Sequence, residues 1–299
     1  MCETLSPILP AMSYPFKSLR IREGLIREVT PRCFMAEATV KFDKGVTAED
    51  ALVVCCFPSV GMVSSVVAHF LIDHLELEFI GGVTHSQLPA LCLIQDGAPY
   101  PPIRAYAGAP ICKVDDCQSV ILIMSELVVP EPLVHDIVTA LFDWSKESGT
   151  RKGVLIDAFA RKGMKGGLNG QEPVVEYEDT EGIDVVGIGT TEDMRKMLED
   201  MKILPLEQGV IKGMTGVMLG EGRRRGLDIM SLMVEADPRY PDARAAAIMI
   251  EHLNTLLPTI DLDYEPLVIE AERIEEQIRS MMEGAEHSSV PPSSSMLYG

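Results

Sequence analysis

The residue types able to carry out chemistry in this chain are few and far apart. Cys112 and Cys117 are five positions apart, with neither a second pair nor a nearby histidine, and this spacing is poor for zinc. Gly187–Thr191, a turn between a predicted strand and a helix, could bind a phosphate, although a third glycine and a basic partner are missing. Asp157, at the end of a predicted strand, could line a sheet-edge crevice or cap a turn. We therefore expect no metal site, no cofactor and no catalytic residue.

The last three residues, Leu297-Tyr298-Gly299, are a sharper candidate for a functional site. Residues 284–296 are mostly small and polar and include two adjacent prolines, a composition that predicts a flexible tail. An aromatic side chain at the end of such a tail serves no folding purpose. It could instead fill an apolar slot on a partner, with the phenol donating a hydrogen bond and the terminal carboxylate meeting a cation.

Residues 264–283 carry a heptad pattern that predicts an amphipathic helix with an acidic outer face. Its small or apolar residues recur at intervals of three and four. We call five of them the C-terminal seam: Leu267, Ala271, Ile274, Ile278 and Met281. The C-terminal seam could join the subunits of a homo-oligomer, or it could pack against its own domain, and the pattern leaves both alternatives open.

The overall charge restricts the class of partner. The chain has 299 residues and a formal net charge of −19, and nucleic acids and anionic membranes both repel such a surface. We therefore expect neither as the main partner. Arg223–Arg225 is the only basic run, and either a solvated helix end or a contact with an acidic loop would explain it.

Cysteine usage and the N-terminal half predict a cytoplasmic protein. Seven cysteines are an odd number, and Cys55 and Cys56 lie inside an apolar run, so a secreted disulfide framework is not expected. Residues 51–72 contain no charge over a length that could cross a bilayer. Pro58, Gly61 and His69 interrupt this stretch, which favours a buried strand leading into a buried helix.

These functional candidates must be positioned by alternating strands and helices. Continuous apolar strands that alternate with helices predict an α/β fold with three layers, in which a largely parallel sheet has helices on both faces. We expect a flexible N-terminus at 1–16, a single α/β domain at 17–263, the helix at 264–283 and the tail at 284–299. The segments that support this prediction are 52–57, 119–124, 154–156, 184–188 and 229–234 as strands, and 59–71, 130–148, 192–202, 217–224 and 241–257 as helices.

Three further segments carry specific expectations. Residues 78–106 look like additional antiparallel strands and loops, and residues 162–171 look like a glycine-rich loop. Val210–Ile211 is expected to form a short strand. Ser59, and Thr190 or Thr191, are expected to cap the helices that follow them.

The order of several short motifs resembles the archaeal proteasome assembly chaperone family of the PbaA and PbaB type. The resemblance covers roughly Val53 to Met282. The motifs that carry it are Phe57-Pro58-Ser59-Val60-Gly61-Met62-Val63, Ile80-Gly81, Asp143-Trp144-Ser145-Lys146-Glu147-Ser148-Gly149, Gly216-Val217-Met218-Leu219, Arg225-Gly226 before the strand to Glu235, and Ala271-Glu272-Arg273-Ile274-Glu275. Ser64-Ser65 departs from the glycine or small apolar residues of many relatives.

The resemblance implies a fold like that of nucleoside phosphorylases without their catalytic residues, assembly into homo-oligomers, and no cofactor. It also implies that Leu297, Tyr298 and Gly299 match the hydrophobic–Tyr–any tail of proteasome activators. In those proteins the tail inserts between subunits of the α-ring of the proteasome core particle, pairs its carboxylate with a lysine, and promotes gate opening.

We therefore expect a proteasome-binding chaperone or activator that works without ATP. Two alternatives from other classes stay open. One is a small-molecule enzyme of the nucleoside-phosphorylase or ATP-dependent ligase kind, with a crevice near Gly187–Thr191 and Asp157. The other is an oligomeric scaffold whose tail is incidental.

Overall fold

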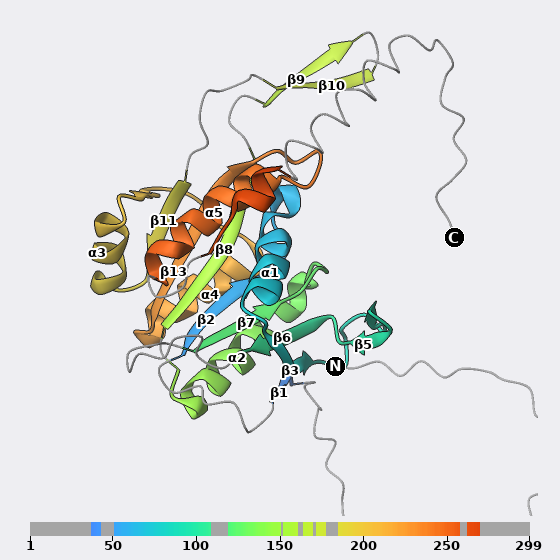
Figure 1. Ribbon diagram of the computed structural model, residues 1–299, viewed down its shortest axis with the longest axis vertical. Helices are drawn as coiled ribbons and strands as arrows, with labels where there is room; N and C mark the ends of the chain where they lie inside the picture. The colour runs from blue at the N-terminus through green and yellow to red at the C-terminus, as the bar shows by residue number, and fades with distance from the viewer. Residues whose placement is uncertain are drawn as a thin grey trace, which may run out of the picture. The chain divides into compact units, whose positions relative to one another are not determined.

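A nine-stranded mixed sheet organises the described part of the chain (Figure 1). The computed structural model describes residues 37–42, 51–108, 119–150, 152–160, 164–169, 172–177, 185–257 and 262–269. In spatial order the strands are β1 (Thr39–Phe42), β3 (Glu78–Thr84), β6 (Ile103–Ala107), β7 (Val120–Met124), β2 (Leu52–Cys56), β8 (Lys152–Ala160), β13 (Asp228–Ala236), β11 (Val185–Gly189) and β12 (Leu204–Pro205).

The sheet is parallel at its centre and antiparallel at its flanks. Strands β7, β2, β8 and β13 are parallel to one another, and β11 and β12 are parallel to each other in the opposite direction. Strands β1, β3 and β6 add antiparallel pairing on one side, as predicted for residues 78–106, and β11 is antiparallel to β13 on the other. Two separate hairpins complete the described strands: β4 (Leu93–Gln95) with β5 (Ala98–Tyr100), and β9 (Met164–Asn169) with β10 (Glu172–Tyr177).

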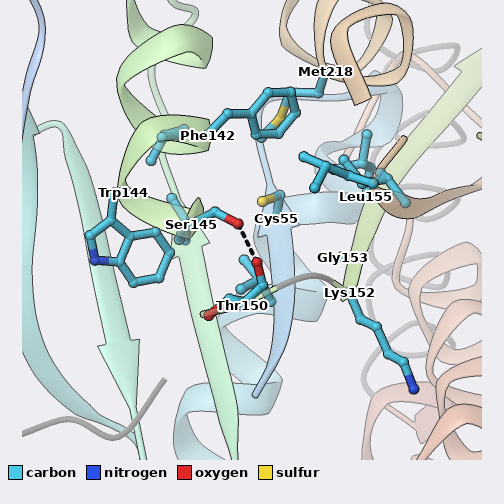
Figure 2. A pocket seen from close by; sticks show the side chains of 14 residues that line it. Cys55, Phe142, Trp144, Ser145, Thr150, Lys152, Gly153, Leu155 and Met218 are labelled. Carbon is cyan, nitrogen blue, oxygen red and sulfur yellow. Dashed lines mark hydrogen bonds between the residues drawn. The ribbon is translucent and has the colours of Figure 1, made fainter. Parts of the chain in front are cut away.

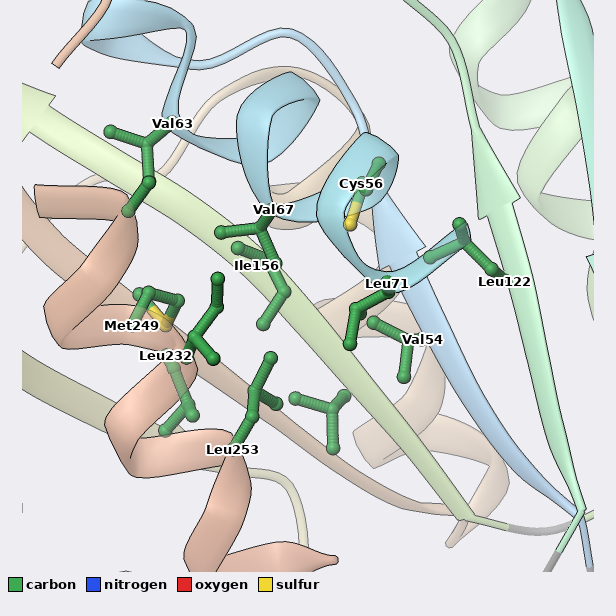
Figure 3. Packing of buried hydrophobic residues seen from close by; sticks show 14 of the residues in the cluster. Val54, Cys56, Val63, Val67, Leu71, Leu122, Ile156, Leu232, Met249 and Leu253 are labelled. Carbon is green, nitrogen blue, oxygen red and sulfur yellow. The ribbon is translucent and has the colours of Figure 1, made fainter. Parts of the chain in front are cut away.

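Helices cover both faces of this sheet, which confirms the predicted three-layer α/β architecture. The α-helices that lie wholly within the described residues are α1 (Val63–His74), α2 (Val134–Ser148), α3 (Glu192–Asp200), α4 (Gly213–Arg225) and α5 (Ala243–Leu256). Helices α1, α3 and α5 contribute to one buried cluster, and α2 and α4 contribute to the other. Figure 3 shows α1 and α5 packed side by side over β2, β8 and β13.

The alternation of side chains along β2 explains why its sequence is apolar at every position. Leu52, Val54 and Cys56 enter the cluster under α1 and α5, whereas Val53 and Cys55 enter the cluster under α2 and α4. A strand covered on both faces has no solvent-facing side, so it reads as a continuous apolar run.

Two helix ends form as the local sequence predicts, and a third differs. The Thr191 hydroxyl oxygen accepts a hydrogen bond from the Met194 backbone N–H at 3.3 Å and so caps α3. Gly149 ends α2 with a φ of 80°, a left-handed conformation that glycine adopts at little cost. Ser59 was expected to cap the helix that follows it, but the short 3-10 helix Val60–Met62 intervenes and Met62 holds the N-cap position of α1. The Ser59 hydroxyl oxygen still accepts from the Ser64 N–H at 3.0 Å.

Two further local predictions were wrong. The predicted glycine-rich loop at 162–171 contains strand β9, whose backbone groups pair with those of β10. The prediction failed because glycine has a low strand propensity, so the composition did not indicate a strand. Val210–Ile211 is not a strand, and Val210 is 87% exposed. The sheet ends instead at β12, a two-residue strand with Pro205 at the edge position that proline tolerates.

A small apolar cavity of about 40 Å³ lies between β2, β8 and the helices α2 and α4 (Figure 2). Cys55, Phe142, Leu155 and Met218 are among its lining side chains, and Lys152 points away from them. Burial raises the pKa of the Cys55 thiol to about 12, so this sulfur stays protonated and unreactive.

Replacing Gly153, which lines this cavity, with alanine should stabilise the protein. A methyl group there would contact Ile229 Cγ1 and the Val53 carbonyl oxygen at 3.7 Å, an ordinary van der Waals distance. The strand would also lose less backbone entropy on folding, so we expect the free energy of unfolding to rise by about 0.5 to 1 kcal/mol in urea denaturation.

Gly82→Ala is the matched control. A methyl group at Gly82 would lie 2.6 Å from the Ile103 carbonyl oxygen, so this variant should be less stable than the parent protein. Destabilisation by both substitutions would show that the space beside Gly153 is not available.

Candidate functional site

The predicted binding and oligomerisation residues fall almost entirely outside the described part of the chain. Leu267 is the exception. Those that lie outside it, and stay predictions, are Ala271, Ile274, Ile278, Met281, Leu297, Tyr298 and Gly299.

The chain leading to Leu267 is fixed against its own α5. The Asn254 side chain donates to the Leu262 carbonyl oxygen at 3.0 Å and accepts from the Leu262 N–H at 2.9 Å. Residues 265–269 then form a helical turn, and Tyr264 and Leu267 pack against the core cluster under α1 and α5. At this one described position, the C-terminal seam faces its own domain.

Leu267 and the outer side of α1 line an open groove of about 700 Å³, which we call the α1 groove. Met62, Val66 and Phe70 supply apolar lining from α1 and the residue before it. Polar lining comes from His69, Asp73, His74 and Glu126. The α1 groove is thus an apolar surface with an acidic and imidazole-bearing rim, which suits a peptide segment better than a small polar substrate.

A buried ion pair supports one wall of the α1 groove. Arg104 is fully buried in β6, and its guanidinium donates to both carboxylate oxygens of Glu126. The Arg104 Nε also donates to the Tyr106 hydroxyl at 2.7 Å. His69 Nε2 lies 3.1 Å from Glu126 Oε1, so the carboxylate links the buried arginine to the groove.

The ionisation of this network suits a structural role. Burial alone would raise the pKa of Glu126, but hydrogen bonds from Arg104 and His69 outweigh it and hold that pKa at about 2. A carboxylate this acidic is a poor general base near neutral pH. Burial raises the pKa of Tyr106 despite its hydrogen bond from Arg104, so its phenol stays protonated as well.

The turn at Gly187–Thr191 and Asp157 do not form one crevice. Gly189 pairs with Met230, whereas Asp157 pairs with Met233, three residues further along β13 or roughly 10 Å. A methyl group at Gly189 would lie 2.7 Å from the Arg195 nitrogen, so α3 packs directly on this glycine. The structure therefore does not bring together the residues that the enzyme alternative required.

Asp157 has local partners that account for it. Its Oδ1 accepts a hydrogen bond from the Ala158 N–H at 2.8 Å, and it also bonds to the Thr215 side chain. Burial raises its pKa above the ordinary range in spite of these bonds. Asp157 lies inside β8 and not at the end of a strand as predicted, so these contacts within the fold account for it instead of a turn cap.

The basic run at the end of α4 is occupied by contacts within the chain. Arg224 and Arg225 both bond to Glu221, and Arg223 donates to the Thr190 carbonyl oxygen at 3.4 Å. Arg225 also pairs with Asp143 at 2.9 Å. That ion pair joins two motifs that lie far apart in the sequence, one on α2 and one on α4.

The motif before α1 forms a tight junction with the start of α5. Gly61 has a φ of 60°, and a methyl group there would lie 2.9 Å from the Asp237 carbonyl oxygen. The Gly61 carbonyl oxygen accepts from the Asp242 N–H at 2.8 Å. In α1 itself, the buried Ser64 hydroxyl donates to the Ile156 carbonyl oxygen at 2.8 Å, which accounts for the polar residue at this position.

Sequence reasoning missed the pair of Arg104 and Glu126. The available signal was a single arginine within the otherwise apolar stretch 103–107.

Among the described residues, no group of three or more His, Cys, Asp or Glu side chains could hold a metal ion. No helix in those ranges has the length and apolarity needed to cross a membrane.

Comparisons with known proteins agree on one family. The model of the PAC2 family matches residues 53–282. The crystal structure of Pyrococcus furiosus PbaA, an archaeal homolog of proteasome-assembly chaperone, is 31% identical, with a TM-score of 0.67 over 84% of this chain and 94% of that one. P. furiosus PbaB, an archaeal proteasome activator, is 20% identical, with a TM-score of 0.68 over 83% and 100% of the two chains.

An uncharacterised protein of Methanocaldococcus jannaschii, MJ0106, is also similar. It is 25% identical over 257 residues, which cover 84% of this chain and 90% of that protein.

Replacing Glu126 with glutamine keeps the shape of the side chain but leaves the buried Arg104 without a counterion. We expect the free energy of unfolding at pH 7 to fall by about 3 kcal/mol or more. In the parent protein the carboxylate stabilises the fold above its ordinary pKa of 4.5, and this contribution is lost as the pH falls toward 2. The variant should lack that part of the acid dependence, measured by urea denaturation across this range.

Glu192→Gln is the control, because Glu192 is 94% exposed and pairs with Arg195 at 3.5 Å on the surface of α3. It should change stability by less than about 1 kcal/mol. Similar losses for the two variants would contradict a special role for the buried pair.

Proposed function

Because the chain belongs to the PAC2 family, we propose that it binds the proteasome core particle and assists its assembly or opens its gate without ATP. The observation that carries this proposal is the 31% identity to PbaA, a homolog of proteasome-assembly chaperone, over 84% of the chain. The family match covers residues 53–282, which include helices α1 to α5, so the relation concerns the domain and not a single motif.

The proposed contact with the core particle is the terminal tripeptide, inserted between subunits of the α-ring. Tyr298 would place its ring in an apolar slot, Leu297 would add apolar contact, and the carboxylate of Gly299 would meet a cation. The 13 residues from Gly284 to Met296 would give this tripeptide a typical reach of about 20 Å.

A single short tail binds weakly, so the proposal includes a homo-oligomer that presents several tails at once. Linked binding events can raise the overall affinity by factors of about 10² to 10⁴ without any new contact. A ring of identical pockets is a suitable partner for such an arrangement.

Asp157 and the basic run Arg223–Arg225 are held by contacts within the chain. These contacts support a binding role, which needs no cofactor, over catalysis. Adding ATP with magnesium should therefore leave the melting temperature nearly unchanged. Occupancy at 100 times Kd would add about 2.7 kcal/mol of stability, an easily measured shift. A clear rise in melting temperature would favour the nucleotide-dependent enzyme instead.

Tyr298→Ala should abolish co-purification with the core particle and peptidase activation on a fluorogenic peptide. Loss of an anchoring aromatic costs on the order of 2 kcal/mol per tail, and the cost multiplies across the tails of an oligomer. Adding one residue after Gly299 should have a similar effect, because the tyrosine is then no longer penultimate. Tyr298→Phe should be milder, since only the hydroxyl is lost.

Ser294→Ala, in the same tail, is the matched control and should bind normally. Retained binding in both the alanine and the extended variants would refute docking through the tripeptide. It would favour a scaffold whose tail is incidental, or contact with the core particle through another surface.

A further inference from the structure

Helix α1 has apolar residues on its outer side as well as on the side that faces the sheet. Its inner residues Val63, Val67 and Leu71 are fully buried against the sheet. Its outer residues Val66 and Phe70 are only partly buried, and Met62 just before it is 50% exposed. Asp73 is the only carboxylate in the helix, which has no lysine or arginine. Exposed apolar side chains that lie together mark an interaction site, so we expect the apolar part of the α1 groove to be covered by another segment.

The C-terminal seam enters this groove. Leu267 lines it together with Val66 and Phe70. Within the helical turn 265–269, the seam position Leu267 packs on the domain, whereas the off-seam residue Ile269 is 60% exposed. The first described turn therefore already has the orientation that would direct the rest of the C-terminal seam toward α1.

The dimensions of the two elements match. Helix α1 has 12 residues and is about 18 Å long at 1.5 Å per residue. The stretch from Leu267 to Ile278 also has 12 residues and, as a helix, the same length of about 18 Å. Ala271, Ile274 and Ile278 follow Leu267 by about one, two and three turns on the same side.

We propose that Ala271, Ile274 and Ile278 of the C-terminal seam, which continue from Leu267 in the same chain, occupy the α1 groove. Continuity favours the same chain over a second copy, because Ala271 is only four residues beyond a side chain already in the groove. The seam then acts within the subunit, its acidic outer face points to solvent, and the terminal tail starts from a fixed place beside α1. This inference does not depend on what the tail binds.

A disulfide cross-link tests the proposal in the full chain. Val66→Cys with Ile274→Cys would be made in a background where Cys2, Cys33, Cys92, Cys112 and Cys117 are serine, which leaves the buried Cys55 and Cys56 in place. Mild oxidation should link the two cysteines within one chain, seen as a monomer of altered mobility. The yield should exceed that of a Val66→Cys, Glu276→Cys control by about tenfold, since position 276 is on the outer face of the heptad.

Cross-links mainly between chains would show that a second copy fills the groove and would overturn the proposal. Equal yields from the two cysteine pairs would overturn it as well.

A second measurement avoids reliance on the cysteine pair. The rate of maleimide labelling at Val66→Cys should rise by about tenfold when Ile274→Asp and Ile278→Asp are added, because the groove is then uncovered. Circular dichroism would verify that the fold is retained. An unchanged labelling rate in a folded variant would contradict occupancy by the seam.

Discussion

The architecture depends on burying the central strands on both faces at once. β2 and β7 are buried at every position, so neither can face water on any side. Two separate helical layers are then required, one from α1, α3 and α5 and the other from α2 and α4. Two of the sequence motifs connect helices that belong to the same layer. The junction at Gly61 fixes α1 to α5, and the pair of Arg225 with Asp143 fixes α4 to α2.

The same constraint explains why a charged residue inside this fold needs internal partners. Arg104 lies in a fully buried strand, where an isolated guanidinium would be very costly, and Glu126 and Tyr106 satisfy its donors. Because Glu126 also lines the α1 groove, the network lies where the core meets an open surface. The polar groups there are engaged with one another, and the groove offers mainly apolar area to a partner.

Sequence patterns revealed the parts of the fold that local physics determines. Apolar runs identified β2, β7 and β13, and a side-chain cap at Thr191 and a glycine at 149 marked helix ends correctly. β9 was missed because its stability comes from pairing with β10, which composition does not report. The Arg104 pair was missed for a related reason: Glu126 reaches it through the antiparallel register of β6 and β7, which opposes Arg104 to Met124. The tail and the C-terminal seam were visible only as sequence patterns, apart from the contact that Leu267 makes.

The two-residue strand β12 has a consequence for how copies of this domain can associate. An exposed sheet edge is a template for strand addition, by which subunits join into continuous sheets and sometimes aggregate. At β12 the edge is very short and Pro205 carries no N–H to offer an incoming strand. This edge is therefore protected against sheet-to-sheet polymerisation, and assembly on this side of the molecule would have to proceed through side-chain surfaces. Unlike a strand edge, a side-chain surface selects its partner through the particular residues that it presents.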